Sequence, residues 1–284
     1  MRVRVLGSAA GGGFPQWNCR CEMCEAARVG ERARPRTQSS LAIRGDEGPW
    51  FLVNASPDLR QQLETLTPRP ADGVRASPIA GVLLTDAEID HTAGLLLLRE
   101  STSPVRVFGD AGIERALTDT LVRMLDRFCG VDWQTLEPGR ASSLEGSSLV
   151  VEPFHAGAEQ TSGFAFRDQA TGGVATYAPA LARLDDGVLA RFADSDLVLV
   201  DGTFWRDDEL AQLGISDRSA RDMGHVPLSG PGGTLEVLAG LQRPRTVLVH
   251  INNTNPILLE DSPEREEVVR AGVEVAYDGL EVDL

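Results

Sequence analysis

Residues Ala80–His91 read AGVLLTDAEIDH, and this stretch indicates both the fold and the position of a site. The apolar run Gly81–Thr85 has the length and composition of a buried strand. The polar residues that follow it are Asp86, Glu88, Asp90 and His91. In open α/β folds, side chains at the carboxyl ends of strands form the site. We therefore expect functional groups just beyond this strand.

Two further apolar runs end in the same way. DLVLVDGTFW (Asp196–Trp205) reaches Asp201, and TVLVHINNTNP (Thr246–Pro256) reaches His250. Taken singly, Asp201 could cap a turn and His250 could be a buried core histidine. Together with the Asp90-His91 pair they predict carboxylates and imidazoles at one rim of a sheet, which is a plausible mixed N/O metal site.

The small number of histidines narrows the chemistry of this site. The chain has four, at positions 91, 155, 225 and 250. Two histidines with a carboxylate fit a 2-His-1-carboxylate site with open positions, which suits non-haem Fe(II) and O₂. A dinuclear zinc hydrolase normally has more imidazole ligands, and Asp86 and Glu88 offer only oxygen. The pattern favours oxygenation over hydrolysis without excluding either.

Composition sets the class of protein. The chain has 284 residues. Strand-like runs such as Val105–Gly109 and Leu197–Val200, and helical patterns such as Ala180–Ala193, recur along its length. We expect a layered α/β or αββα architecture in one domain spanning residues 1–284. The net charge of −15 makes nucleic acid and anionic membranes poor partners. The absence of lysine excludes Schiff-base and lysine general-base chemistry.

The sequence also bears on location. The N-terminus lacks the pattern of a signal peptide, and no apolar run has the roughly 18 residues of a membrane span. We expect a cytoplasmic protein without a membrane partner. A homodimer is among the states that the sequence allows.

Three of the four cysteines lie in WNCRCEMC (Trp17–Cys24). A cytoplasmic location disfavours a disulfide. Cys21 and Cys24 could form a redox pair, but Cys19 would then have no role. Three thiolates on a tight loop fit three corners of a tetrahedral structural zinc site better.

A fourth ligand for that zinc would be Cys129 or a histidine. We expect His225, because it follows a glycine in RDMGHV (Arg221–Val226) and does not end an apolar strand.

The strand–Asp–His–helix pattern, with Asp201 and His250, resembles the metallo-β-lactamase superfamily. The signature of that superfamily is His-x-His-x-Asp-His, and here the six positions read Asp86-Ala87-Glu88-Ile89-Asp90-His91. Both leading histidines are missing. The departure puts the usual two-zinc hydrolysis in doubt.

A closer resemblance, to the pyrroloquinoline quinone (PQQ) synthesis protein B family, covers nearly the whole chain and is weakest at Val131–Gly163. The motifs that carry it are VLGSAAGGGFPQWNCRCEMC (Val5–Cys24), RPRTQSSLAI (Arg34–Ile43), NASPDLRQQL (Asn54–Leu63), IDHTAGLLLLRE (Ile89–Glu100), MGHVPLSGPGG (Met223–Gly233) and HINNTNPILLEDSPER (His250–Arg265). The resemblance implies an αββα metallo-β-lactamase fold and a role in making the cofactor PQQ. It further implies an iron-dependent enzyme that uses O₂ to hydroxylate the tyrosine ring of a peptide-derived Glu-Tyr unit. A carrier of PQQ or its precursor, or a zinc or manganese hydrolase, is the alternative.

The resemblance also implies roles for particular residues. Asp90, His91 and His250 would hold the active-site Fe(II), with Asp201 as a fourth ligand or a supporting group. Related superfamily members pair a Cys-rich N-terminal loop with a Gly-His, which supports His225 as the ligand that joins Cys19, Cys21 and Cys24 on zinc. The candidates for holding the substrate are Arg36, Ser39, Asn54, Asp58, Asn252 and Asn253. The stretch NASPD (Asn54–Asp58) could instead be only a strand end with a helix cap at Ser56.

Overall fold

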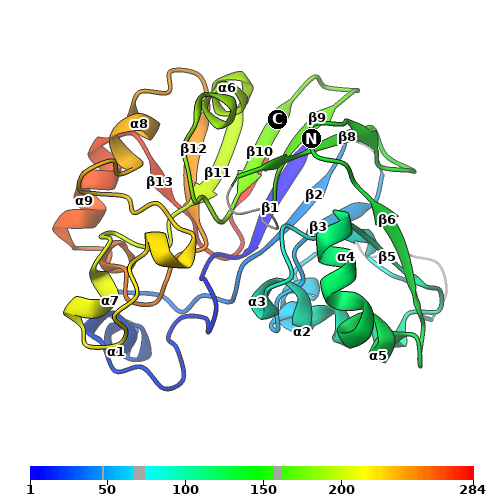
Figure 1. Ribbon diagram of the computed structural model, residues 1–284, viewed down its shortest axis with the longest axis horizontal. Coiled ribbons are helices and arrows are strands. Elements are labelled where there is room, and N and C mark those ends of the chain that lie inside the picture. The colour runs from blue at the N-terminus through cyan, green and yellow to red at the C-terminus, as the bar shows by residue number, and fades with distance from the viewer. Residues whose placement is uncertain (47, 67–73, 157–161) are drawn as a thin grey trace.

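The structure, a computed structural model, describes residues 1–46, 48–66, 74–156 and 162–284. Within these residues two seven-stranded mixed sheets form the centre of the molecule (Figure 1). The first sheet has the order β14-β1-β2-β3-β4-β5-β6, and its parallel part runs from β3 to β6. Its strands are β1 (Arg2–Gly7), β2 (Ser40–Arg44), β3 (Trp50–Val53), β4 (Ile79–Leu83), β5 (Val105–Gly109), β6 (Val131–Thr135) and β14 (Glu281–Asp283).

The second sheet has the order β13-β12-β11-β10-β9-β8-β7, and its parallel part runs from β10 to β13. Its strands are β7 (Ser142–Ser143), β8 (Leu149–His155), β9 (Ser162–Asp168), β10 (Val174–Ala178), β11 (Leu197–Asp201), β12 (Arg245–Val249) and β13 (Glu274–Val275). Every residue of β11 is buried, as expected for a parallel strand covered on both faces.

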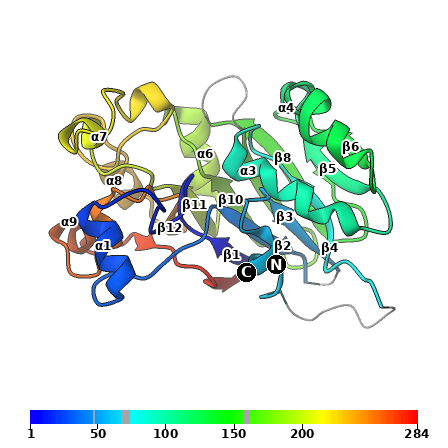
Figure 2. The same ribbon diagram turned by 90° about the horizontal axis from the view of Figure 1, so that it is seen from below.

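Helices cover the outer face of each sheet (Figures 1 and 2). Those of the first sheet are α2 (Leu59–Leu63), α3 (Ile89–Thr92), the 3₁₀ helix η1 (Ala93–Glu100), α4 (Ala111–Leu117), the π-helical turn η2 (Thr118–Val122) and α5 (Arg123–Leu125). Those of the second half are α1 (Glu22–Val29), α6 (Asp186–Asp194), α7 (Glu209–Gln212), η3 (Arg221–Met223), α8 (Leu235–Ala239), η4 (Pro256–Leu258) and α9 (Pro263–Arg270).

Three apolar clusters lie between these layers. One fills the space between the sheets and includes Phe51, Phe164 and Tyr177. A second packs helices on the first sheet, and a third packs α1, α6, α8 and α9 on the second. Three interfaces separate four layers, so the αββα architecture predicted from the sequence is confirmed. None of the helices in the described part of the chain has the length and apolar character needed to cross a membrane.

Candidate metal centre

The strands that end in polar residues belong to different sheets. β4 lies in the first sheet, and β11 and β12 lie side by side in the second. Their carboxyl ends meet at one edge of the molecule, where the side chains of Asp90 and His250 come within 3.5 Å. The site therefore straddles the two sheets.

His91 follows β4 and is fixed through one ring nitrogen. Its Nδ1 lies 2.7–2.8 Å from the two carboxylate oxygens of Asp86. The same carboxylate accepts the backbone N–H of Glu88 at 2.9 Å and the hydroxyl of Thr85 at 2.8 Å. Burial alone would lower the pKa of His91, but the Asp86 and Asp90 carboxylates raise it to about 9. Asp86 thus acts as an anchor for the imidazole, in the manner of carboxylate–histidine–metal arrangements.

Asp201, at the end of β11, is fully occupied by neighbouring donors. Its Oδ1 accepts the N–H and the hydroxyl of Thr203 at 2.9 and 2.6 Å. Its Oδ2 accepts the N–H of Leu181 at 2.8 Å and the Nδ1–H of His225 at 2.6 Å. A carboxylate has about four acceptor positions, and all are used. Of the two roles expected for Asp201, the structure favours the supporting one.

His250 follows β12 with a left-handed backbone, φ 54°. The Thr203 hydroxyl lies 2.9 Å from its Nδ1. Because that hydroxyl gives its one proton to the Asp201 carboxylate, its oxygen accepts the Nδ1–H of His250. The free nitrogen of His250 is therefore Nε2, as it is in His91.

These two free nitrogens converge on one carboxylate. Oδ2 of Asp90 lies 3.7 Å from Nε2 of His91 and 3.5 Å from Nε2 of His250. Ligand atoms of the three residues lie within 4.8 Å of one another. Nε2 of His91 is buried without a hydrogen-bond partner, which is costly unless it ligates a metal. Two imidazoles and a carboxylate fit Fe(II) or Zn(II).

His225 lies in this site and not beside the cysteines. Its ring stacks on that of His250, with centroids 5.5 Å apart and planes at 19°. It belongs to a second possible ligand group with Asp201 and His250. The expectation that His225 completes the cysteine site is therefore wrong: the short hydrogen bond to Asp201 holds it at the other site.

The Gly-rich loop after β1 (AAGGG, Ala9–Gly13) forms a wall of the metal centre. A Cβ at Gly11 would lie 3.2 Å from Oδ2 of Asp90. The N–H of Ala10 donates to the carbonyl of Ile251, the residue after His250, at 2.9 Å. A side chain at position 11 would press on a candidate metal ligand, which explains the glycine.

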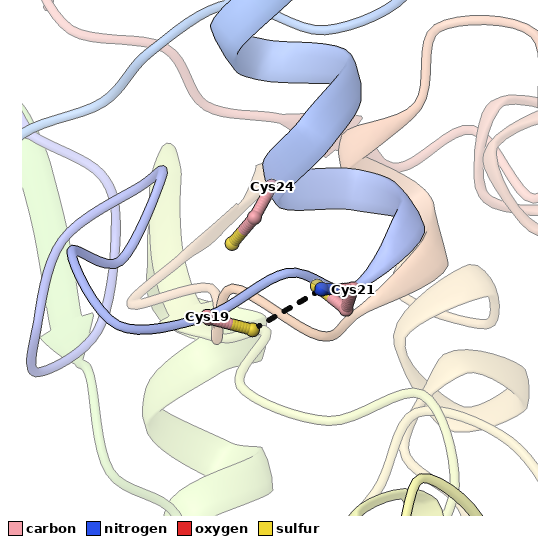
Figure 3. A group of neighbouring side chains, drawn as sticks. All are labelled: Cys19, Cys21 and Cys24. Atoms are coloured by element: carbon pink, nitrogen blue, oxygen red, sulfur yellow. Dashed lines mark hydrogen bonds between the residues drawn. The ribbon is translucent and has the colours of Figure 1, made fainter.

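The three N-terminal cysteines form a separate cluster (Figure 3). Cys24 lies in the first turn of α1 and is buried, while Cys19 and Cys21 precede the helix and are half-buried. Their sulfurs lie within 4.8 Å of one another. Although burial opposes it, the backbone N–H of Cys21 and the neighbouring thiols lower the pKa of Cys19. Burial raises the pKa of Cys21 to about 12. Without a metal, the surroundings therefore favour the thiolate at Cys19 and the neutral thiol at Cys21.

Comparison with known proteins shows where this arrangement belongs. The Beta-lactamase superfamily domain matches residues 49–251. The chain is 48% identical to the coenzyme PQQ synthesis protein B of Cupriavidus necator, over 99% of each chain. It is 46% identical to that of Methylococcus capsulatus, over all of both. The crystal structure of Zn(2+)-bound PqqB from Methylobacterium extorquens matches with a TM-score of 0.90 and 42% identity, covering 100% of both chains.

The chain belongs to the coenzyme PQQ synthesis protein B family. The metallo-β-lactamase fold predicted from the Asp90-His91 motif is confirmed with it.

Membership of the PQQ synthesis protein B family makes the altered signature informative. Asp86 and Glu88 occupy the positions of the two leading superfamily histidines. Asp86 turns to His91, and the exposed Glu88 accepts the hydroxyl of Thr92 through its backbone carbonyl at 2.8 Å. Neither joins the ligand group that the structure brings together. The centre of this family member is thus poorer in imidazole than the superfamily signature.

The six predicted substrate contacts lie in different surroundings. Arg36, Ser39, Asn54 and Asn253 are buried, and Asp58 and Asn252 are half-buried. Nη1 of Arg36 donates to the Ala276 carbonyl and to the Ser8 hydroxyl. Asp58 accepts the backbone N–H of Gln38 at 2.9 Å. These contacts join the segment around Arg36 and Gln38 to the segments that carry Ser8, Asp58 and Ala276.

Asn54 supports the metal centre from within, whereas Ser39 lies against a buried tyrosine. Asn54, with a left-handed φ of 64°, donates to the Thr85 hydroxyl and accepts the N–H of Thr85, both at 3.0 Å. The hydroxyl of Ser39 lies 3.0 Å from that of the buried Tyr177. Since Thr85 in turn binds Asp86, the polar chain leads from Asn54 to His91.

Sequence reasoning missed the supporting residues Thr85 and Thr203. A threonine next to a strand-end carboxylate is too common to stand out. The signal that could have revealed Thr203 is its spacing, two residues after Asp201. At that spacing its hydroxyl reaches the carboxylate and can also accept from a nearby imidazole.

Proposed function

We propose that this chain acts in the synthesis of PQQ as an iron-dependent enzyme that uses O₂ to hydroxylate the tyrosine ring of a peptide-derived Glu-Tyr unit. Family membership supports the pathway. The observation that carries the reaction type is the donor set: the Nε2 atoms of His91 and His250 and one carboxylate oxygen of Asp90, with the remaining carboxylates engaged elsewhere.

This donor set supports oxygenation better than hydrolysis. Three protein ligands on one side leave positions open for substrate and O₂. A bound Fe(II) would supply activation of O₂ for attack ortho to the phenol oxygen. One oxygen atom would enter the ring and the other would leave as water, with the two electrons that this requires supplied by an external reductant. A second metal would find only one further imidazole nitrogen, Nε2 of His225, because His250 has only Nε2 free and the acceptor positions of Asp201 are in use.

The protein's own groups would orient the substrate. His225 is the most exposed of the three imidazoles, with 12% of its side chain accessible against 3% for His91 and 7% for His250. Nδ1–H of His225 donates to Asp201, so Nε2 of His225 is an acceptor. We assign that nitrogen to the phenol O–H of the substrate. Burial of His91 and Asp86 keeps water from the anchored face of the centre.

For the cysteine cluster we propose a zinc ion with a structural role, bound by Cys19, Cys21 and Cys24. Thiolate ligands suit zinc, and the N/O centre suits iron. We therefore expect the purified protein to hold one zinc tightly and to take up one Fe(II) anaerobically.

The proposed function is tested by following O₂ with an electrode. The protein, reconstituted with Fe(II) and supplied with a reductant such as ascorbate, should consume O₂ above the background of the reductant only when a Glu-Tyr substrate is added. Loading the same site with Zn(II) should abolish this consumption. Hydrolysis of phosphodiesters or peptides with Zn(II) or Mn(II), independent of O₂, would favour the hydrolase instead. Tight PQQ binding without turnover of any precursor would favour a carrier.

A further inference from the structure

A buried carboxylate outside the metal centre lies between the two loops that support the centre. Glu209, at the start of α7, is 8% exposed. Its Oε2 accepts the backbone N–H of Trp205, in the loop after β11, at 2.7 Å. Its Oε1 accepts the hydroxyl of Thr254, in the loop after β12, at 2.5 Å. Glu209 therefore joins the loop that carries Thr203 to the loop that follows His250.

A short chain of hydrogen bonds leads from this carboxylate to Asn252. The hydroxyl of Thr254 gives its one proton to Glu209, so its oxygen can only accept from other groups. It accepts Nδ2–H of Asn252 at 2.6 Å. The amide therefore has a fixed orientation, with Nδ2 towards Thr254 and Oδ1 turned away. Asn252 is half-buried, and within the described part of the chain its Oδ1 accepts no hydrogen bond.

Asn252 lies close to the metal centre. It is two residues after the candidate ligand His250. Its backbone N–H donates at 3.1 Å to the carbonyl of Thr203, whose hydroxyl binds Nδ1 of His250. An amide oxygen accepts hydrogen bonds, so it fits an amine and not a carboxylate. A Glu-Tyr unit with a free amino end offers such an amine besides its carboxylates.

Protonation of Glu209 would reverse the orientation of this amide. Its Oε2 faces the N–H of Trp205 and has to remain an acceptor, so the added proton would be on Oε1 and donate to Thr254. The hydroxyl of Thr254 would then need an acceptor of its own. A half-turn of the Asn252 amide brings Oδ1 to that hydroxyl and turns Nδ2 outward. Burial raises the pKa of Glu209 to about 7, so both forms are populated near neutral pH.

Few other charged or titratable groups face Glu209. The carboxylate of the neighbouring Asp208 also raises its pKa, and the β11 loop adds Arg206, whose side chain is exposed. The β12 loop presents the neutral Thr254. Behind that loop, the thiol of Cys21 donates to the backbone of the residue before Thr254. A change of the Asn252 amide near neutral pH is therefore assigned to Glu209, and Asp208 provides a control.

We propose that Oδ1 of Asn252 binds the amino group of the substrate, and that the ionised carboxylate of Glu209 holds the amide in the orientation that this requires. Glu209 is then a positioning residue, which acts through Thr254. The identity of the bound group rests on the proposed function, whereas the orientation of the amide does not.

Calorimetric binding of the dipeptide Glu-Tyr to the zinc-loaded protein, without O₂, tests the recognition. If only the form with ionised Glu209 binds the amine, a pKa of about 7 predicts an affinity about tenfold lower at pH 6 than at pH 8. Glutaryl-tyrosine, which is the same molecule without the amine, should lack this difference. Glutaryl-tyrosine with the full pH dependence of Glu-Tyr would overturn the recognition of the amine.

The variant Glu209→Gln tests the positioning role. Its oxygen has to face the N–H of Trp205, so its NH₂ would face Thr254 as the protonated acid does. It should bind Glu-Tyr weakly at both pH values. The matched control Asp208→Asn removes the neighbouring charge and should keep the difference between pH 6 and pH 8. A Glu209→Gln protein that keeps that difference would contradict the proposal.

The orientation is measured without a ligand from the side-chain amide resonances of Asn252 in NMR spectra, which are identified by their loss in Asn252→Asp. They should move between pH 8 and pH 6 with a midpoint near 7, and in Glu209→Gln they should stay at their pH 6 position. Resonances that do not move in the parent chain would disprove the reorientation. Neither measurement requires turnover, so a lack of O₂ consumption would contradict the proposed reaction alone.

Discussion

Asp86→Asn is the substitution that tests most sharply how this centre is held. The side chain keeps its shape but loses the charge that accepts Nδ1–H of His91 at 2.7–2.8 Å. One oxygen becomes an NH₂ facing either the Thr85 hydroxyl or the Glu88 N–H, both of which now donate to Asp86. Loss of such an anchoring partner weakens metal binding by about 10- to 100-fold, or about 1.4–2.7 kcal/mol.

The assay is anaerobic titration of Fe(II) against a competing chelator, with zinc already in place. Glu88→Gln is the matched control. It removes an equal charge that also raises the pKa of His91, but from an exposed side chain. It should bind Fe(II) within about twofold of the parent, because a surface charge is screened. An Asp86→Asn protein that binds Fe(II) as well as Glu88→Gln would refute the anchoring role.

Three further outcomes are expected. His225→Gln should keep its Fe(II) stoichiometry but lose about tenfold to a hundredfold in kcat/KM, since one buried hydrogen bond to the substrate is removed; loss of bound iron would instead make His225 a ligand. Burial raises the pKa of Glu209 from 4.5 to about 7, so its stabilising contribution is complete below about pH 4.5 and is lost as the pH rises through 7. Glu209→Gln, which retains partners at Trp205 and Thr254, should therefore match the parent in urea unfolding near pH 5 and exceed it by up to about 3 kcal/mol near pH 8. Gly94→Ala should lower the free energy of unfolding by about 3 kcal/mol or more, because its Cβ would lie 2.1 Å from the Ser56 carbonyl oxygen; an unchanged urea midpoint would show that η1 can move away.

Buried parallel strands were the part of the fold most accessible from sequence. β5 matches the predicted strand Val105–Gly109. β11 (Leu197–Asp201) is one residue longer than the predicted run Leu197–Val200. These strands are buried on both faces, so their apolar runs are continuous and their ends are marked by charge. For the same reason the prediction brought Asp90, His91 and His250 to one place, as the structure does.

Helix boundaries and loop contacts were less accessible. The helix expected at Ala180–Ala193 begins only at Asp186, where Asp185 caps Val188. The apolar residues before Asp186 lie in a loop, where their spacing resembles that of a helix. The short α1, which carries Cys24, has too few apolar positions for a clear pattern.

The position of His225 at the metal centre has a tertiary cause. His225 follows Gly224, which has a left-handed φ of 84°, in an irregular segment after η3. Its partner Asp201 is 24 residues away, and no local pattern records that contact. The zinc-ligand spacing rule could identify the thiols but not the fourth group.

The measurement that tests the central claim most directly is isotope incorporation. The Fe(II)-loaded protein is supplied with a Glu-Tyr substrate and isotopically labelled O₂ in unlabelled water, and the product is analysed by mass spectrometry. The proposed chemistry predicts labelled oxygen on the tyrosine ring in the parent chain and none with His91→Ala or His250→Ala. Oxygen derived from water, or an equal yield of labelled product from those two variants, would contradict it.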